Sequence, residues 1–320
     1  MNKILIIGFG NIGKRHLEGF SGITSEVYIV DIKFLNPREV EIEKNKIETK
    51  ATKFKNFYFY ADISCINKEE LFDLVIVALS IDQRLNVLNW LKKSNYKILL
   101  IEKPLFNKKN QYSKQYELLC SRKSFVNTTV RHQKWLKEIF KLLMVGDEKV
   151  VIRVSGNNWG LSCNAIHYLD FFADLLKTPL NLIRVSIETS IHKVINSKRN
   201  GYEEVLGVLA YTFGNNGLLI LEDLGGGSKS EITVEVGGIR VDLPWWTGGK
   251  ALINDNGTKI SEIEGRMQYL SEMSSEIHRL EISEFKNYLK LTDAIVLNQL
   301  VIDGIEMGGR SLGIKNIKFT

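Results

Sequence analysis

The sequence predicts an α/β protein that begins with a doubly wound parallel sheet and continues into an α+β domain with a mostly antiparallel, open sheet. Three observations predict this arrangement. Short apolar runs alternate with amphipathic stretches in the first third of the chain, a glycine-rich turn follows the first apolar run, and turn signals recur at short intervals beyond residue 150. Strands that alternate with helices pair in parallel, whereas strands joined by tight turns pair antiparallel.

Length and apolar content favour two domains. The chain has 320 residues, of which 44% are apolar, and a single hydrophobic core usually stops growing at about 250–300 residues. We expect an amino-terminal domain over residues 1–123 and a carboxy-terminal domain over residues 124–320.

Charge and cysteine content argue against several other classes of protein. The net charge is +6, but the lysines are scattered among many acids and form no basic stripe of the kind that binds nucleic acid. Cys65, Cys120 and Cys163 are too widely spaced for a disulfide framework or a metal site. No apolar run reaches the length of a membrane span or of a signal peptide. We therefore expect a cytoplasmic protein that binds no nucleic acid, membrane or metal.

The expected elements follow from the spacing of apolar residues. In the first third, residues 33–56 are rich in Lys and Glu and are expected to be irregular. Strands are expected at 4–7, 27–30, 74–79, 97–101 and 125–129, and helices at 12–20 and 82–93. Beyond residue 150, we expect a strand at 150–155, a helix at 163–177, hairpins that turn at 214–217 and 237–238, a turn at 254–257, and helices at 276–290 and 293–307.

The glycine-rich turn has the spacing of a dinucleotide-binding motif, with a predicted strand before it and a predicted helix after it. The first glycine permits the tight turn, the second lets the backbone approach a pyrophosphate, and the third lets the helix pack closely on the strand. The helix N-terminus offers N–H groups and a partial positive charge to the phosphates. These features predict a Rossmann dinucleotide site rather than a turn that binds nothing. The motif consists of Gly8, Phe9, Gly10, Asn11, Ile12 and Gly13.

An acidic residue ends the next predicted strand. Asp31 is placed to accept hydrogen bonds from the adenosine ribose, and its charge would repel a 2′-phosphate. The sequence therefore predicts NAD as the cofactor, and NADP is not excluded because Lys33 lies two residues further on. We also include Ser80, Glu102 and Lys103, which follow or end later predicted strands, among the residues expected to bind the cofactor.

A lysine at the end of the fourth predicted strand is the first candidate for catalysis. Lys103 follows Glu102 and precedes Pro104, which restricts it to extended geometry. Ligands of parallel sheets bind at the carboxyl ends of the strands, and a partly buried lysine there can exchange a proton with a substrate hydroxyl. Taken alone, the pattern fits a surface lysine better.

The turn at residues 8–16 together with Glu-Lys-Pro at residues 102–104 resembles the Gfo/Idh/MocA family of oxidoreductases, which includes glucose-fructose oxidoreductase and inositol dehydrogenase. Softer similarities extend the resemblance over essentially the whole chain. The form with Arg15-His16 is similar to members associated with bacterial surface-sugar biosynthesis. The resemblance implies a Rossmann domain and a second domain whose open sheet often mediates oligomers, which predicts a homodimer or homotetramer.

The resemblance also implies that Lys103 and a histidine of the second domain line the substrate site. The family's Asp-x-x-x-His-x-x-Asp segment matches residues 163–170 at His167 and Asp170, but Cys163 replaces the first aspartate. On a helix these three positions share one face, so His167 can assist Lys103 in proton transfer while Asp170 orients its ring. Because a thiol is a poor general base when protonated, we expect a different substrate or proton relay; a thiolate nucleophile at position 163 is the alternative.

Three further residues have open roles. Arg131 and Trp159 are candidates for substrate contact, with a packing role as the alternative for each. Arg84 could contact an anionic group, although an arginine on a solvated helix face is the favoured interpretation.

The expected function is hydride transfer between NAD(P) and a sugar, sugar nucleotide or related polyol. Two alternatives stay open: a reductase of imines or amino sugars with the same fold, and a non-catalytic NAD-binding sensor or partner module, because fold alone does not dictate function.

Overall fold

The computed structural model describes residues 3–20, 26–49, 56–109, 113–143, 148–177, 180, 184–226, 230–244, 248–279, 284–314 and 317–319. The chain divides into two compact units. The first comprises Met1–Leu105, Tyr112–Asn127 and Tyr269–Ala294, and the second comprises Phe106–Gln111, Thr128–Gln268 and Ile295–Thr320. The chain thus returns to its first unit after residue 268, which the expected boundary at residues 123 and 124 did not include.

A seven-stranded sheet forms the centre of the first unit, in the order β15-β6-β5-β4-β1-β2-β3. All neighbours pair in parallel except β15, which runs antiparallel to β6. The predicted parallel sheet is therefore confirmed, as are its five predicted strands. The strands are β1 (Lys3–Ile7), β2 (Glu26–Val30), β3 (Asn56–Tyr60), β4 (Leu71–Val77), β5 (Asn95–Glu102), β6 (Ser124–Asn127) and β15 (Leu289–Lys290).

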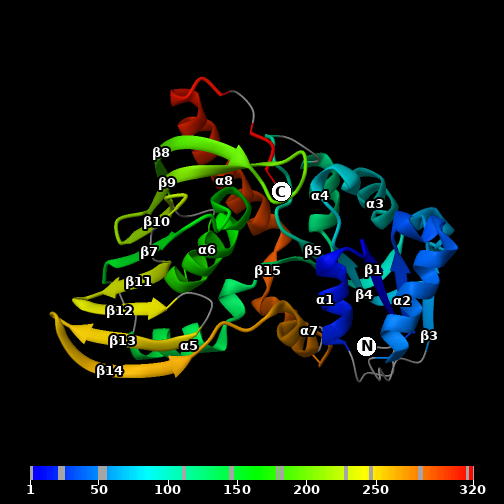
Figure 1. Cartoon of the computed structure of the whole chain (residues 1–320), viewed down its shortest axis with the longest axis horizontal. Helices are drawn as coiled ribbons and strands as arrows, with labels where there is room; N and C mark the ends of the chain where they lie inside the picture. Colours follow the sequence, from blue (N-terminus) through cyan, green and yellow to red (C-terminus); the bar gives the residue numbers. More distant parts are fainter. Residues whose placement is uncertain are drawn as a thin grey trace. The chain divides into compact units, whose positions relative to one another are not determined.

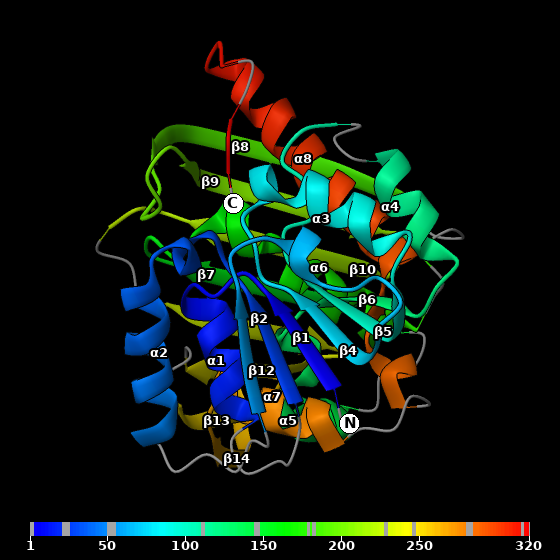
Figure 2. The same cartoon turned by 90° about the vertical axis from the view of Figure 1, so that its right-hand side faces the viewer.

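Helices cover both faces of this sheet, as Figures 1 and 2 show. Helices α1 (Asn11–Gly19) and α7 (Leu270–Arg279) pack against each other on one side, whereas α3 (Arg84–Leu91) and α4 (Ser113–Cys120) lie on the other. Side chains alternate between the two faces of a strand, and because helices cover both faces, the central strands β1, β4 and β5 are apolar on both.

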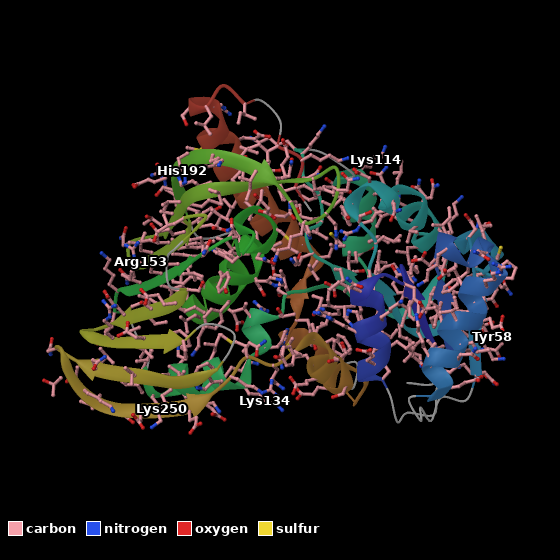
Figure 3. The ribbon with its side chains drawn as sticks, viewed as in Figure 1. Tyr58, Lys114, Lys134, Arg153, His192 and Lys250 are labelled. Carbon is pink, nitrogen blue, oxygen red and sulfur yellow. The ribbon has the colours of Figure 1, made fainter. Side chains whose placement is uncertain are left out.

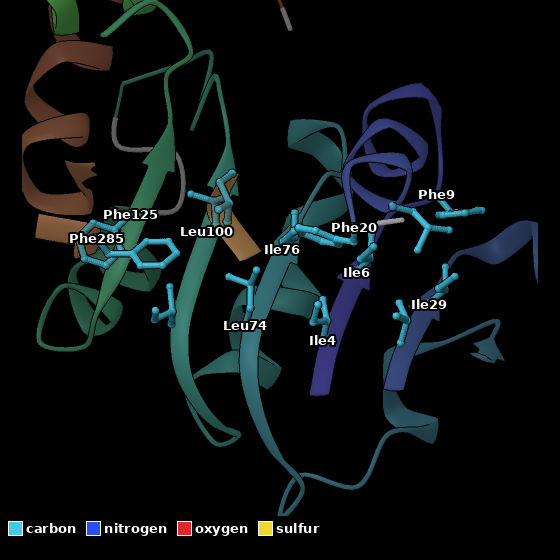
Figure 4. Packing of buried hydrophobic residues seen from close by; sticks show 14 of the residues in the cluster. Ile4, Ile6, Phe9, Phe20, Ile29, Leu74, Ile76, Leu100, Phe125 and Phe285 are labelled. Carbon is cyan, nitrogen blue, oxygen red and sulfur yellow. The ribbon is translucent and has the colours of Figure 1, made fainter. Parts of the chain in front are cut away.

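The core between the sheet and α1 is continuous across the strands. Ile4, Ile6, Leu74 and Ile76 point to one side of their strands and are fully buried. Figure 4 shows them in a row with Leu100 and Phe125 along the sheet. The buried aromatic side chains of this core are Phe9, Phe20, Phe34, Phe125, Phe285 and Tyr288.

The prediction that residues 33–56 are irregular was wrong for the described part of that segment. It forms the 3-10 helix η1 (Ile32–Leu35), helix α2 (Pro37–Thr49) and the start of β3. Pro37 occupies the first helical position, where its missing N–H costs nothing. Only Phe34 and Ile47 bury large apolar side chains here, and these two anchors are too sparse to give a clear periodic signal.

The predicted helix over residues 276–290 was also wrong in its extent. Helix α7 begins earlier, at Leu270, and ends at Arg279; residues 280–283 lie outside the described residues. A 3-10 turn, η5 (Glu284–Asn287), and strand β15 follow. Phe285 is fully buried against Phe125, and Leu289 pairs with Val126, so packing and strand pairing override the local helical pattern.

The second unit contains an eight-stranded sheet in the order β14-β13-β12-β11-β7-β10-β9-β8. Only β7 and β10 pair in parallel, so the mostly antiparallel sheet is confirmed, together with both predicted hairpins and the turn at 254–257. The strands are β7 (Val150–Gly156), β8 (Val185–Asn196), β9 (Glu203–Phe213), β10 (Gly217–Asp223), β11 (Glu231–Val236), β12 (Ile239–Pro244), β13 (Gly249–Asp255) and β14 (Thr258–Gly265).

Helix α6 (Leu161–Leu176) packs on β9 and β10, on one face of this sheet. The unit also contains the 3-10 turn η4 (Val130–His132), helix α5 (Lys134–Leu143) and most of helix α8 (Leu291–Ser311), which contains the predicted helix at 293–307. Figure 3 shows Arg153 on the face of the sheet that points away from α6. Among the described helices, none combines the length and the apolar character that crossing a bilayer would need.

Candidate functional site

The glycine-rich turn after β1 has the geometry that its spacing predicts. Gly8 has φ +94°, and a Cβ added there would lie 2.7 Å from the Ala78 carbonyl oxygen. A Cβ on Gly13 would lie 2.1 Å from the Gly8 carbonyl oxygen. Both positions therefore exclude any side chain, and α1 begins directly above the end of β1.

Gly10 differs from the other two glycines because it faces open space. It is exposed, and a Cβ there would meet no atom within 4 Å. Gly10 is the N-cap of α1 and contributes no side-chain hydrogen bond to the first helical N–H groups. The N–H groups and the partial positive charge at this end of the helix are therefore available to an anion, as a bound pyrophosphate requires.

Asp31 lies beside this turn, where β2 ends. Its Oδ2 accepts a hydrogen bond from the Phe9 amide at 2.6 Å, and its Oδ1 accepts one from the Lys33 amide at 3.1 Å. Each carboxylate oxygen can accept a second hydrogen bond, so the group can still receive the two hydroxyls of a ribose. The turn and the carboxylate together fit the adenosine half of a dinucleotide.

The turn that carries Lys103 is held by two side chains of the same unit. Lys103 is half-buried and precedes Pro104 through a cis peptide bond. The Pro104 carbonyl accepts a hydrogen bond from Arg84 Nη1 at 2.6 Å, and the Leu105 carbonyl accepts one from the Tyr116 hydroxyl at 2.8 Å.

Arg84 was expected on a solvated helix face, and that interpretation was wrong. The side chain is 1% exposed. Its Nε and Nη2 donate to the Leu79 carbonyl at 3.0 and 2.8 Å, so one guanidinium joins the loop after β4 to the Lys103–Pro104 turn after β5. Burial of a guanidinium is costly unless it is hydrogen-bonded, which is why its carbonyl partners are essential to it. Leu79 lies five residues before Arg84, but Pro104 lies twenty residues after it and left no signal in the sequence.

Glu102 belongs to a buried polar network. Its Oε1 lies 2.8 Å from His16 Nε2 and accepts a hydrogen bond from Asn127 Nδ2 at 2.6 Å. The Nδ1 of His16 lies 2.8 Å from the Ser274 hydroxyl. Although burial disfavours the charged form, these hydrogen bonds hold the pKa of Glu102 below its usual range. The network ties α1 and α7 to the end of β5, next to Lys103.

Ser80 lies in the loop after β4. It is half-buried, and its hydroxyl donates to Gln83 Oε1 at 3.0 Å at the start of the 3-10 turn η3 (Ile81–Gln83). The first unit thus places the residues expected to bind the cofactor at or after the carboxyl ends of β1, β2, β4 and β5, where ligands of parallel sheets bind.

His167, on α6 in the second unit, accepts a backbone hydrogen bond at one ring nitrogen, which defines its neutral tautomer. The ring is 7% exposed, and its Nδ1 accepts a hydrogen bond from the Thr129 amide at 3.1 Å. A ring nitrogen that accepts an N–H carries no proton, so the neutral ring carries its proton on Nε2. His167 is therefore arranged as a hydrogen-bond donor through Nε2.

Asp170 makes its contacts with Thr128 and Arg131 rather than with His167. The carboxylate is fully buried, accepts from the Thr128 hydroxyl, and lies 2.7 Å from Arg131 Nη2. Burial raises the pKa of Asp170 to about 7, against the opposing effect of Arg131. Arg131 in turn lies 3.5 Å from Asp174, so these contacts anchor the η4 turn, and with it Thr129, to α6.

Trp159 and Cys163 lie at the start of α6. The indole N–H of Trp159 donates to the Glu222 carbonyl at 2.9 Å, and its ring packs edge-on against Tyr168. Cys163 is half-buried in the first turn of the helix. It shares a helix face with His167 and Asp170, as the sequence predicted.

Two carboxylates that sequence reasoning did not single out for this role fix the start of α6. Asp223 is 1% exposed and accepts hydrogen bonds from the amides of Asn158, Trp159 and Gly160 at 2.8, 2.9 and 3.2 Å. Glu204 accepts one from the Ser162 amide at 3.0 Å. An acidic residue at the end of an apolar strand was the available signal for Asp223.

Solved oxidoreductases share the fold of the chain over nearly its whole length. An oxidoreductase from Agrobacterium radiobacter, solved with NAD+, L-tartaric acid and magnesium, matches with a TM-score of 0.72 and 12% identity over 97% of each chain. A Gfo/Idh/MocA family oxidoreductase from Vibrio cholerae matches with a TM-score of 0.69 and 12% identity, over 98% of this chain and all of that chain.

A dehydrogenase (MviM) from Clostridium difficile matches with a TM-score of 0.63 and 14% identity, over 96% of this chain and 99% of that chain. No protein-family model matches the chain, and no curated protein sequence matches it. The fold of the chain is therefore that of these oxidoreductases and dehydrogenases, which is the fold that the resemblance implied.

The buried Arg84 generates the first prediction. Arg84→Leu leaves the Leu79 and Pro104 carbonyls without their donor, so amide hydrogen exchange of Lys103 and Leu105 is expected to accelerate. The expected loss of stability is about 1–3 kcal/mol, the usual effect of removing a charged hydrogen-bond donor. Hydrogen-exchange mass spectrometry of the peptide that contains residue 103 measures the first effect, and urea unfolding the second.

Arg122→Leu is the matched control, because Arg122 also donates to two backbone carbonyls of the first unit, those of Leu91 and Ser94. It should leave exchange at Lys103 unchanged. Equal acceleration in both variants would show that Arg84 has no special hold on this turn.

The buried Asp170 generates a pH prediction. Its pKa of about 7 lies above the ordinary value of 3.8 that it regains on unfolding. Between about pH 4 and about pH 7 the folded chain therefore holds a proton that the unfolded chain releases, so this group makes stability fall as the pH rises. Urea midpoints at about pH 5 and about pH 8 should show this loss in the wild type and not in Asp170→Asn.

Asp174→Asn is the control for this experiment, because Asp174 also approaches Arg131 but is half exposed. It should still lose stability between these two pH values, although removal of the Asp174 charge lowers the pKa of Asp170 somewhat. A pH dependence that survives unchanged in Asp170→Asn would contradict the assignment.

Proposed function

We propose that this chain is a nicotinamide-dependent oxidoreductase of the Gfo/Idh/MocA type, with NAD as its cofactor. The observation that carries the proposal is the turn from Gly8 to Gly13, with its exposed Gly10, beside the Asp31 carboxylate. The Agrobacterium radiobacter oxidoreductase of the same fold was solved with NAD+, which supports this choice of cofactor.

The residues of the first unit fit such a cofactor. The N–H groups at the start of α1 would receive the pyrophosphate, and Asp31 would accept hydrogen bonds from the adenosine ribose. When bound, the nicotinamide supplies the chemistry of giving or taking a hydride. The remaining task for the protein is to bind and orient the substrate and to move a proton.

Lys103 is the group that we assign to proton transfer. Its ammonium can protonate the oxygen of a substrate carbonyl as that carbonyl is reduced, and its amine can accept the proton in the opposite direction. The hydrogen bonds of Arg84 and Tyr116 to Pro104 and Leu105 hold the backbone on one side of Lys103. Glu102 holds it on the other side through His16 and Asn127.

For His167 we propose a role as a hydrogen-bond donor to a substrate oxygen. The contact between its Nδ1 and the Thr129 amide supports donation from Nε2. An imidazolium would have to give up this contact, because its Nδ1 would carry a proton. His167 therefore serves to bind and polarise the substrate, and proton transfer falls to Lys103.

The substrate class that we propose is a sugar, a sugar nucleotide or a related polyol, in a pathway of surface-polysaccharide or unusual-sugar biosynthesis in the cytoplasm. Half-buried Trp159 and Cys163 at the start of α6, together with Arg131, are proposed to border the substrate. The thiol in place of a carboxylate at position 163 supports a second candidate, a reductase of imines or amino sugars, which paired hydroxyl and amino substrates would distinguish.

We further propose that the chain forms a homodimer or homotetramer through the face of the second sheet that points away from α6. At its centre this face carries half-buried apolar side chains, which a partner would cover. Light scattering of the purified protein tests this. The apolar side chains are Val151, Val208, Ala210, Leu218 and Ile220.

The role of Lys103 is tested by Lys103→Met. Removal of a group that moves a proton in the transition state is expected to lower turnover by about 100-fold or more. Binding of NADH should change only slightly, because the adenosine and pyrophosphate contacts are unaffected. Steady-state kinetics on sugars and sugar nucleotides, with NADH titration by fluorescence, measure the two quantities separately.

Lys123→Met is the control, because Lys123 is an exposed lysine of the same unit without side-chain contacts among the described residues. It should retain full turnover. A Lys103→Met protein that turns over at the wild-type rate would contradict the proton-transfer role, and NADH binding without turnover of any substrate in the wild type would favour a non-catalytic binding module.

A further inference from the structure

A cluster of charged side chains lies beside the turn that carries Phe9. Its centre is Glu43, on α2, which is 4% exposed. Glu43 Oε1 lies 2.5 Å from Lys14 Nζ and 3.4 Å from Lys33 Nζ, and the exposed Lys46 of the same helix lies 3.7 Å away. Glu43, Lys14 and Lys33 come from α2, α1 and the turn after β2, and we call these three residues the Glu43 cluster.

The two lysines of the cluster lie beside Phe9, the residue whose amide binds the Asp31 carboxylate. Lys33 Nζ donates to the Phe9 carbonyl at 2.9 Å, and the Phe9 amide donates to Asp31 Oδ2. Measured from the centre of the Phe9 ring, the ammonium of Lys33 lies at 4.8 Å and that of Lys14 at 5.8 Å. Figure 4 shows Phe9 just beyond Ile6, at the end of β1.

In this arrangement a 2′-phosphate on the ribose would be subject to both repulsion and attraction. Asp31 repels a 2′-phosphate, and a cation close to it would attract one. The ammonium group of Lys33 interacts electrostatically with Asp31, and that of Lys14 lies beside the same Phe9 ring, but both are engaged by one buried carboxylate. Burial disfavours the charged form of Glu43, yet the hydrogen bond from Lys14 and the charge of Lys33 keep its pKa below the usual range. Glu43 is therefore ionised at neutral pH and cancels much of the positive charge.

We propose that Glu43 determines the choice between NADH and NADPH, because it holds Lys14 and Lys33 away from the 2′-position of the ribose beside Asp31. The proposal rests on the cofactor site proposed above and deepens it. Asp31 alone repels the extra phosphate, and Glu43 removes the two cations that would compensate for that repulsion. Selectivity for NADH over NADPH therefore depends on Glu43 as well as on Asp31.

The test is the ratio of the dissociation constants for NADPH and NADH in Glu43→Gln. Glutamine keeps the shape of the side chain but removes the negative charge that pairs with Lys14 and Lys33. The ratio is expected to fall about tenfold, the scale of one charge-assisted hydrogen bond, mainly through tighter NADPH binding. Adding Lys14→Gln to this variant should restore most of the wild-type ratio. Glu43→Ser, with the same expected result, covers the case in which the first variant does not fold.

Glu41→Gln is the matched control, because it removes the same charge from an exposed position of the same helix that contacts neither lysine. It should leave the ratio unchanged. An unchanged ratio in Glu43→Gln, or an equal fall in Glu41→Gln, would overturn the proposal while NADH binding still supports the cofactor site. A wild-type protein that binds neither dinucleotide would overturn the cofactor site itself.

Discussion

The close approach of helix α1 to strand β1 is the constraint on which the rest of the first unit depends. A side chain at Gly13 would meet the Gly8 carbonyl at 2.1 Å, so the helix can approach the strand this closely only because residue 13 is glycine, while the positive φ of Gly8 permits the turn before it. The same approach brings His16, one turn further on, to the buried end of β5, where it meets Glu102. The position of α1 therefore determines both where a phosphate can bind and how the Lys103 turn is supported.

Buried carboxylates hold the start of α6 in the second unit. Asp223 accepts hydrogen bonds from three amides of the loop before α6, and Glu204 accepts one from an amide at the start of the helix. Each acceptor gives a partner to N–H groups just before or at the start of the helix, where no intrahelical acceptor is available, and this fixes the entry of the chain into the helix. Because His167 and Asp170 lie on the same helix, this fixed start also determines their positions. The contacts of Asp170 with Thr128 and Arg131 then fix the amide of Thr129, which sets the tautomer of His167.

The parts that the sequence predicted were those with a strong local signal. The apolar strand at 4–7, the spacing of the three glycines and the acidic end of the second strand each follow from nearby residues alone. Helix α2 was missed because only a few buried side chains anchor it among many lysines and glutamates. Strand β8 was missed although Val185, Ile187 and Ile191 alternate with polar residues along it, so its signal was present in the sequence.

The buried roles of charged residues could not be predicted because their partners are distant in sequence. Arg84 looked like a surface residue, since a helix pattern does not reveal that the Pro104 carbonyl lies within its reach. Asp170 was expected to orient His167, but it contacts Arg131, which is 39 positions away. In the same way, Lys33 was expected to weaken the preference for NAD. The sequence did not reveal that Glu43, on the next helix, lies beside its ammonium group.

We propose that the turn from Gly8 to Gly13, together with Asp31, binds a nicotinamide dinucleotide through its pyrophosphate and adenosine ribose. Calorimetric titration of the purified wild-type protein with NADH, repeated in the presence of saturating ADP-ribose, measures this binding. We expect one NADH to bind per chain and to be displaced by ADP-ribose, which carries the same two groups without nicotinamide. No binding of NADH, or binding that ADP-ribose does not displace, would contradict it.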